Sequence, residues 1–199
     1  MIEWRLLDSG IKAIAGVDEA GRGACAGPLV VAALILKDPN DPSLREVRDS
    51  KLLSPIQREN FYELILNQVC AHAIIEISSE EIDTRGLHKS NIEGMRRAVN
   101  ALGVTPDYVL TDGYEVPGMS HPNLAVWKGD QVALTISAAS IIAKVYRDRL
   151  MIELDRKYPG YGLAEHKGYV TKVHSDAMKK LGITPVHRKS YANVAKLIK

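Results

Sequence analysis

The sequence predicts an α/β fold, in which short buried strands alternate with amphipathic helices along one chain. Two runs, at 29–36 and 108–113, read as short buried strands, and segments with helical spacing of apolar residues lie between them. A complete helix start signal stands at 54–57. With 199 residues, 46% hydrophobic and 25% charged, the chain is typical of a globular protein with a substantial core.

The first two strands are expected at 11–18 and 27–37, paired across a glycine-rich loop that follows Asp18 and Glu19. Neighbouring side chains of a strand point to opposite faces, so these two acids converge on one site only if the strand ends or bends there. Carboxylates held together need a cation, and hard oxygen ligands suit Mg²⁺ or Mn²⁺. The alternative is a solvated turn, and the glycine spacing matches no nucleotide-binding motif.

A helix is expected from Pro55 onward, because Ser54 suits the N-cap, proline suits the first helical position and Gln57 completes a capping box. An apolar stripe at helical spacing marks its core-facing side. The stripe consists of Phe61, Leu64, Ile65 and Val69.

The middle of the chain continues the alternation. We expect strands at 71–77, 108–113 and 124–127, a short helix at 78–85, and an amphipathic helix at 91–102 that ends before Gly103. The segment 1–10 is expected to be a short helix or an arm.

The longest helix is expected at about 132–157, followed by a break at 158–162, a helix at about 171–181 and a last short helical segment. One stripe of the long helix carries polar and basic residues at offsets of three and four. We interpret it as a solvated face, with direct contact to substrate as the alternative. The stripe consists of Ser137, Ser140, Lys144 and Arg147.

The net charge of +2 is unevenly spread, since the segment from His166 to the end holds eight lysines and arginines against one acid. A basic C-terminal segment next to an acidic remainder of the chain suggests a metal site beside a binding surface for a polyanion. The alternative is that the basic segment is a solvated helical surface. Cys25 and Cys70 form no metal or redox motif and are expected to be buried thiols. No basic-then-apolar signal peptide and no apolar run near ~20 residues is seen, so we expect a cytoplasmic protein without a membrane span.

Acids stand at three strand ends: Asp18 with Glu19, Asp112, and Asp130 just before the long helix. Strand ends form the sites of α/β folds. Two divalent ions ~4 Å apart need several carboxylates, and together they clamp the attacking and leaving oxygens of a phosphodiester. The four acids therefore suggest phosphodiester hydrolysis.

Several long motifs resemble the type 2 ribonucleases H, and in particular the bacterial ribonuclease HII family. The resemblance runs in order from about residue 12 to the end, and a minor departure is Tyr191, where members often carry phenylalanine. The segments that carry it are 16–23 (G-V-D-E-A-G-R-G), 49–51 (D-S-K), 110–113 (L-T-D-G), 128–130 (K-G-D), 137–148 (S-A-A-S-I-I-A-K-V-Y-R-D), 158–162 (Y-P-G-Y-G), 166–169 (H-K-G-Y) and 187–190 (H-R-K-S).

The resemblance implies a ribonuclease H-like fold: a central mixed five-stranded sheet flanked by helices, with a C-terminal helical extension. We expect one domain over 1–199, with a catalytic core at about 12–157 and the extension at about 158–199. The implied activity is endonucleolytic cleavage of the RNA strand of RNA–DNA hybrids, and incision 5′ to a ribonucleotide embedded in duplex DNA, leaving 5′-phosphate and 3′-hydroxyl ends.

The resemblance also implies roles for single residues. The catalytic and metal-ligating residues are expected to be Asp18, Glu19, Asp112 and Asp130, with Mg²⁺ or Mn²⁺, two ions per site. Gly21, Arg22 and Gly23 are expected to recognise the ribonucleotide 2′-hydroxyl and the adjacent phosphate. Tyr169 is expected to stack on the following deoxyribose, the alternative being a structural anchor for the next helix. Charge placement suggests phosphate contacts at Lys51 and Lys167.

Two other classes of function stay open. One is another metal-dependent nuclease of similar fold that acts on DNA structures, such as a junction resolvase. The other is a non-catalytic nucleic-acid-binding module, although four acids would repel phosphate without metal ions. Cleavage of duplex DNA with and without one ribonucleotide, and its dependence on magnesium, separates these alternatives. We expect a monomer, with hybrids and ribonucleotide-containing duplexes as partners.

Overall fold

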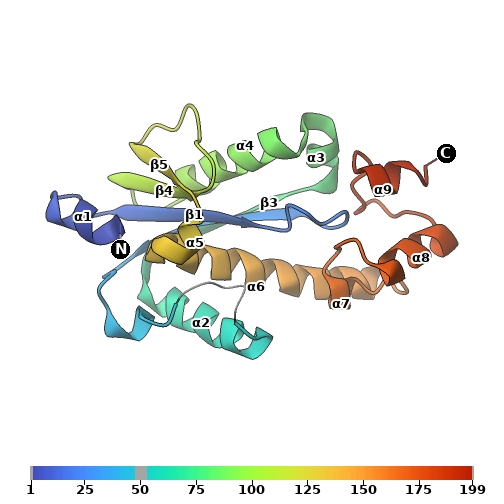
Figure 1. Cartoon of the computed structure of the whole chain (residues 1–199), viewed down its shortest axis with the longest axis horizontal. Helices are drawn as coiled ribbons and strands as arrows, with labels where there is room; N and C mark the ends of the chain where they lie inside the picture. Colours follow the sequence, from blue (N-terminus) through green and yellow to red (C-terminus); the bar gives the residue numbers. More distant parts are fainter. Residues whose placement is uncertain (1, 48–52, 199) are drawn as a thin grey trace.

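The structure, a computed structural model, describes residues 2–47 and 53–198 and contains one five-stranded mixed sheet (Figure 1). The strand order is β3 (Val69–Ile77), β2 (Leu29–Leu36), β1 (Ile14–Ala20), β4 (Tyr108–Asp112) and β5 (Asn123–Val126). β1, β2 and β3 pair antiparallel, whereas β4 runs parallel to both β1 and β5. The expected α/β class with a mixed five-stranded sheet is confirmed.

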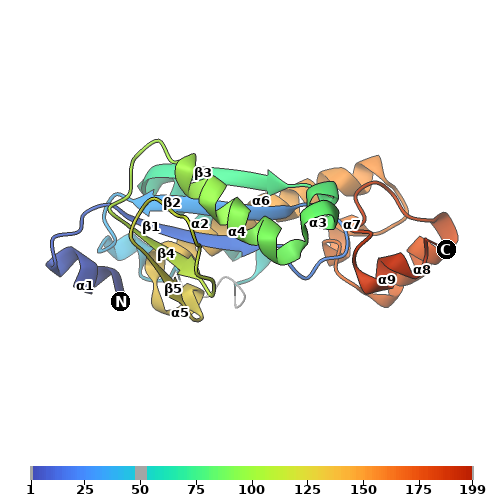
Figure 2. The same ribbon diagram turned by 90° about the horizontal axis from the view of Figure 1, so that it is seen from above.

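Helices cover both faces of the sheet. The long α6 (Leu134–Lys157) and α2 (Pro55–Gln68) lie on one face, and α3 (Ser79–Arg85) and α4 (Leu87–Asn100) lie on the other (Figures 1 and 2). The apolar run of β2 serves both faces, because alternate residues enter opposite core layers. Val30 and Ala32 pack with residues of α6, while Val31 and Ala33 pack with residues of α4.

The start of α2 agrees with the sequence. The Ser54 hydroxyl accepts from the Gln57 N–H, and the Gln57 side chain accepts from the Ser54 N–H, which completes the capping box. The assignment of Val69 to this helix is wrong. Its backbone is extended, and it begins β3 directly after Gln68 without an intervening turn.

The expected start of the long helix at 132 is also wrong. Residues Gly129–Val132 form a separate short helix, α5, and an extended Ala133 separates it from α6. Glu3 of α1 (Ile2–Asp8) supplies the cap that Ala133 lacks. Its Oε1 accepts from the Thr135 N–H at 2.8 Å and from the Thr135 hydroxyl at 3.0 Å, and the Glu3 side chain is fully buried. The expectation of a short N-terminal helix is confirmed.

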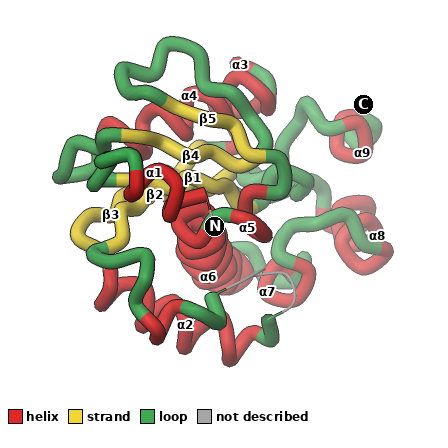
Figure 3. Tube along the Cα trace, turned by 60° about the vertical axis from the view of Figure 1, so that its left-hand side comes forward, coloured by secondary structure: helices red, strands yellow, loops and turns green. Residues whose placement is uncertain are grey.

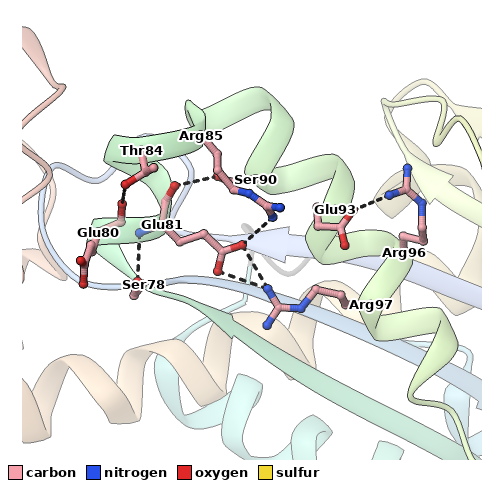
Figure 4. A network of polar contacts seen from close by, with 9 residues as sticks. All are labelled: Ser78, Glu80, Glu81, Thr84, Arg85, Ser90, Glu93, Arg96 and Arg97. Carbon is pink, nitrogen blue, oxygen red and sulfur yellow. Dashed lines mark hydrogen bonds and ion pairs between the residues drawn. The ribbon is translucent and has the colours of Figure 1, made fainter.

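The junction between α3 and α4 is held by polar contacts around Glu81 (Figure 4). The Glu81 carboxylate pairs with Arg85 in its own helix and with Arg97 in α4, both at 3.2 Å. The Ser78 hydroxyl caps α3 by accepting from the Glu81 N–H at 3.0 Å. These partly exposed pairs contribute little free energy of unfolding, but the Glu81–Arg97 pair joins α3 to α4.

The C-terminal elements α7 (Leu163–His166), α8 (Lys172–Leu181) and α9 (Ala192–Ala195) gather at one end of the sheet, opposite α1 (Figures 1 and 2). They share a small core with Cys25 and Met151, so this extension packs on the loop that follows β1. The remaining element is the 3-10 turn η1 (Pro42–Leu44).

Of the two cysteines, Cys25 is buried as expected, but the expectation for Cys70 is wrong. Cys70 lies on β3, an edge strand, and its side chain is exposed there. Neither thiol forms a disulfide. Among the helices of residues 2–47 and 53–198, none is both long and apolar enough to span a bilayer.

Candidate active site

Three of the predicted acids meet at the ends of two neighbouring parallel strands. The pairing of β1 with β4 stops at Val17 and Thr111, so Asp18 and Glu19 extend past the last paired residues, next to Asp112. Burial is the largest cause of the raised pKa of Asp18 and of Glu19, and repulsion from Asp112 adds to it in both. The strand ends therefore bring these carboxylates within electrostatic reach of one another.

The strand does not end at Asp18, contrary to the expectation from its sequence. β1 continues to Ala20, and Asp18 and Glu19 pair regularly with Ala32 and Val31 of β2. Their side chains consequently leave on opposite faces of the sheet. Asp18 meets Ser140 of α6, and Glu19 meets Asn91 of α4.

Asp18 is nearly inaccessible to solvent, with 5% of its surface exposed. Burial raises the pKa of this carboxyl well above its usual value, and the neighbouring Glu19 and Asp112 raise it further. Hydrogen bonds from the Glu19 N–H, at 2.7 Å, and from Ser140 act in the opposite direction. Buried carboxylates whose charged form is disfavoured in this way are characteristic of sites that bind a cation.

Glu19 is likewise a buried carboxyl with a raised pKa. Burial raises its pKa to about 7; the charge of Arg22 acts against this rise, and that of Asp112 adds to it. Its Oε2 atom is buried without a hydrogen-bond partner in the described part of the chain. The fully buried amide of Asn91 faces Glu19 and favours its charged form. An acceptor oxygen left bare beside other carboxylates fits a metal ligand.

The backbone next to Asp130 contacts the cluster. The N–H of Gly129, the residue before it, donates to Asp112 Oδ1 at 2.7 Å, and Asp130 itself is 2% exposed. A side chain at Gly129 would contact Ile136 and that same carboxylate, so only glycine allows this approach. In residues 2–47 and 53–198, no group of three or more His, Cys, Asp or Glu side chains is arranged so that it could hold a metal ion.

The glycine loop 21–23 follows directly after these acids. Gly21 has φ +90°, and a Cβ atom there would lie 1.8 Å from Arg147 Nε. Arg22 places its guanidinium over the ring of Tyr114, at 4.5 Å, just beyond Asp112. A Cβ atom on Gly23 would lie 3.5 Å from the Tyr169 ring, so the structure brings the loop and Tyr169 together.

Two buried arginines, Arg147 of α6 and Arg188, hold this loop. Arg147 donates to the carbonyls of Pro28, Lys167 and Ala26 at 2.9 to 3.1 Å. Arg188 donates to the carbonyls of Gly27 and Arg22 at 3.0 to 3.1 Å. Neither forms an ion pair within the described residues, and desolvation lowers the pKa of both, that of Arg147 to about 10. They place buried positive charge beneath the loop.

The interpretation of the α6 stripe as a solvated face is therefore wrong. Arg147, Ser137 and Ser140 are buried at 1%, 2% and 6% exposure. The Ser137 hydroxyl donates to the Val47 carbonyl at 3.2 Å. Lys144 is the partly exposed member and pairs with Asp148 one turn further on, at 2.6 Å.

Tyr169 is 40% exposed and lies beside Arg147, with 5.8 Å from the guanidinium carbon to the ring centre. Lys167, with φ +52°, donates from its Nζ to the Ala164 carbonyl at 2.6 Å, so its ammonium caps its own short helix. Lys51 lies outside the described residues. Of the predicted substrate-binding residues, the structure thus gathers Gly21, Gly23 and Tyr169, with Arg22 turned toward the acids.

A chain of buried histidines positions the Tyr169 backbone. The Thr184 N–H donates to His187 Nδ1 at 2.9 Å, so Nε2 of His187 donates to His174 Nε2 at 3.1 Å. His174 in turn donates from Nδ1 to the Tyr169 carbonyl at 3.0 Å. Burial, followed by the neighbouring His174, lowers the pKa of His187 to about 4, so the chain is neutral at physiological pH.

Several of these residues were not found by sequence reasoning. Asn91, Ser140, Tyr114 and Arg188 contact the acids or the loop from distant parts of the chain, and no local pattern predicts these contacts. Arg188 stands in the 187–190 motif, but the sequence predicts no role for it. The one available signal was the polar stripe that contains Ser140 and Arg147, which stands on a helix otherwise rich in small apolar residues.

Comparison with known proteins gives a consistent result. The family model described as "Ribonuclease HII" matches residues 15–194. A protein named Ribonuclease HII from Salinispora arenicola is 52% identical over 194 residues, covering 98% of this chain and 72% of its own length. The crystal structure of the ribonuclease H2 from Pyrococcus horikoshii superposes with a TM-score of 0.81 at 30% identity, covering 94% of this chain and 97% of its own.

A more distant solved structure, described as Bst-RNase HIII in complex with Mn²⁺, has a TM-score of 0.76 at 20% identity. It covers 94% of this chain and 69% of its own. At that identity the likeness concerns the fold alone.

Proposed function

The chain belongs to the ribonuclease HII family of metal-dependent endoribonucleases, and on this premise we propose that it hydrolyses the RNA strand of RNA–DNA hybrids at the acid cluster described above. We further propose that it incises duplex DNA 5′ to a single embedded ribonucleotide, leaving 5′-phosphate and 3′-hydroxyl ends. The observation that carries the proposal is the placement of the glycine loop between the clustered acids and the Tyr169 ring.

We assign Asp18, Glu19, Asp112 and Asp130 as the residues that hold two divalent ions. The donor set is made of hard oxygens, which suit Mg²⁺ or Mn²⁺. The bare Oε2 of Glu19 and the raised pKa values of Asp18 and Glu19 support this assignment, because a cation would relieve both. When bound, the ions supply charge stabilisation for the attacking and leaving oxygens of the phosphodiester.

The chain's own residues orient the substrate. The loop at 21–23 has little side-chain bulk, so its backbone can approach a ribose 2′-hydroxyl, the group that distinguishes RNA from DNA. The buried charges of Arg147 and Arg188 lie beneath this loop and favour a phosphate above it. Arg22, held over Tyr114, balances Glu19 and can turn to the same phosphate.

Tyr169 completes the recognition. Its half-exposed ring beside Gly23 is placed to stack on the sugar that follows the ribonucleotide. A 2′-hydroxyl on that sugar would clash with the ring, so the stacked position favours an RNA-to-DNA junction. Lys167 would add a phosphate contact by releasing the Ala164 carbonyl.

A cleavage assay tests the proposal. Three duplexes are compared: a continuous RNA–DNA hybrid, DNA with one ribonucleotide, and the same DNA without it, each with Mg²⁺, Mn²⁺ or chelator. We expect cleavage of the first two only, dependent on metal, with the cut 5′ to the ribonucleotide. Cleavage of the all-DNA duplex would favour a structure-specific nuclease, and binding without cleavage would favour a non-catalytic module.

We also propose that the protein acts as a cytoplasmic monomer. The two free thiols, Cys25 and Cys70, are consistent with a reducing compartment. Sedimentation of the purified protein measures the oligomeric state directly, and a dimer would contradict this part.

A further inference from the structure

A hollow of about 880 Å³ opens beside Asp130, on the side of the acid cluster away from Tyr169. The residues that line it come from α1 and the segment around η1 on one side, and from α5 and the start of α6 on the other. Figure 3 labels the helices α1, α5 and α6. We call this cavity the upstream hollow. Asp130 lines the hollow, so the hollow adjoins the proposed active site at this residue.

Hydrogen bonds join the two walls of the upstream hollow to each other. The fully buried Glu3 fixes α1 to the first turn of α6 through its two bonds to Thr135. The segment around η1 is joined to α6 by the Ser137 hydroxyl, which donates to the Val47 carbonyl, and Leu44 of η1 is buried.

The chemistry of the lining favours a polyanion with flat rings. Arg5 and Arg45 line the hollow, both are exposed, and neither forms an ion pair with another described residue. Trp4, next to Arg5, is 51% exposed. Apart from Asp130, the acid in the lining is Asp41, whose carboxylate accepts bonds from the Ser43 N–H and hydroxyl and so caps η1.

The position of the hollow fixes which part of a substrate could enter it. Along the long axis of the molecule, the C-terminal elements that carry Tyr169 lie at one end and α1 lies at the other (Figure 1). Under the proposed function, Tyr169 contacts the nucleotide 3′ to the ribonucleotide. The strand then crosses the acids and leaves toward α1 on its 5′ side.

We propose that the upstream hollow is a binding site for the substrate strand on the 5′ side of the scissile phosphate. Arg5 and Arg45 contact its phosphates, and Trp4 stacks on a base or sugar. This inference rests on the proposed function for the direction of the strand. It adds a second anchoring point, so that the scissile phosphate is held over the acids from both sides rather than from the Tyr169 side alone.

The test is the double variant Arg5→Ala/Arg45→Ala, with Arg85→Ala as the matched control. Arg85 is also an exposed arginine, but it lies on α3 on the other face of the sheet. Binding is measured by fluorescence anisotropy in chelator, on duplexes of equal length whose ribonucleotide lies near the 5′ or near the 3′ end of its strand. Cleavage by the wild-type protein is measured in parallel with Mg²⁺.

We expect the double variant to bind the duplex with a long 5′ flank more weakly, and the duplex with a short 5′ flank like the wild type. Two lost phosphate contacts should reduce the slope of log affinity against log salt by about 1.8. The defect should therefore shrink roughly tenfold between about 50 and 200 mM salt. Trp4→Ala should weaken binding of the same duplex and leave the slope of log affinity against log salt almost unchanged, because stacking releases no counterions.

An unchanged affinity in the double variant, or an equal loss on both duplexes, would overturn the assignment of the hollow. The same holds if Arg85→Ala matches the double variant. A wild-type protein that fails to cut at the ribonucleotide would instead contradict the proposed function. The variants should keep the wild-type melting temperature, because both arginines are exposed.

Discussion

Replacing Gly21 with alanine should lower both the stability of the protein and its selectivity for DNA that contains a ribonucleotide. The residue has φ +90°, a region in which an L-residue costs ~1–2 kcal/mol. Its new Cβ atom would also lie 1.8 Å from Arg147 Nε, so the buried guanidinium must move. Losing one of its three bonds to backbone carbonyls costs a further ~1.5–3 kcal/mol, because hydrogen bonds to charged groups are strong.

The two terms add to roughly 3–5 kcal/mol, a large part of the ~5–15 kcal/mol that stabilises a typical domain. For a chain of this length, each kcal/mol lowers the melting temperature by ~2–4 °C. We therefore expect Gly21→Ala to melt roughly 6–20 °C below the wild type in a calorimetric scan, and to lose discrimination between DNA with and without a ribonucleotide.

Gly23→Ala is the matched control, since it lies in the same loop. Its φ is not positive, and the new Cβ atom would meet the Tyr169 ring at an ordinary 3.5 Å. Its melting temperature should stay close to that of the wild type, while binding of the ribonucleotide weakens.

A double-mutant cycle locates the clash. Arg147→Ala removes the atom with which the new Cβ atom of Gly21→Ala clashes. The combined variant should therefore lose less free energy of unfolding than the sum of the losses of the two single variants. Additive losses, or a Gly21→Ala protein as stable as the wild type, would refute the reasoning.

Three further predictions follow from the site. Asp18→Asn should abolish metal-dependent cleavage and slightly raise the melting temperature of the metal-free protein, because it removes a charge from a repulsive cluster; near-normal turnover at saturating Mg²⁺ would contradict the metal assignment. Tyr169→Ala should lower cleavage activity at one embedded ribonucleotide roughly ten- to a hundredfold, and should lower it less on a continuous hybrid. Tyr169→Phe should keep most of the activity. Equal losses on both substrates, together with a lower melting temperature, would show that Tyr169 is a structural anchor. The folded-state pKa of His187, about 4, lies below its ordinary 6.5, so the folded protein binds fewer protons than the unfolded chain between these values. Its contribution to stability is complete above pH 6.5 and is lost as the pH falls toward 4, and His187→Gln should flatten the melting temperature against pH in that window.

The sheet and the acid cluster were accessible from the sequence because their signals are local. Each strand is a short apolar run, and the acids stand at the ends of such runs, where parallel strands converge. The capping box at Ser54 and Gln57 likewise needs only neighbouring residues, and it defined the start of α2 correctly.

The buried polar contacts were not accessible, because their partners are distant in sequence. An arginine on a polar stripe is ordinarily solvated, and only the carbonyls of Pro28, Lys167 and Ala26, brought in by the fold, make burial of Arg147 tolerable. For Cys70 the sequence predicted burial, whereas the structure shows the side chain exposed. Its apolar neighbours suggested burial, but the position of β3 at the sheet edge depends on the whole strand order.

The bonds from Arg188 to the carbonyls of Arg22 and Gly27 connect the two ends of the polypeptide. During synthesis the four acids emerge long before residue 188 does. A growing chain thus acquires its complete set of carboxylates while the loop beside them still lacks its last hydrogen-bond donor. The loop at 21–23, to which we assign recognition of the ribose, therefore gains its bond from Arg188 only after that later segment docks.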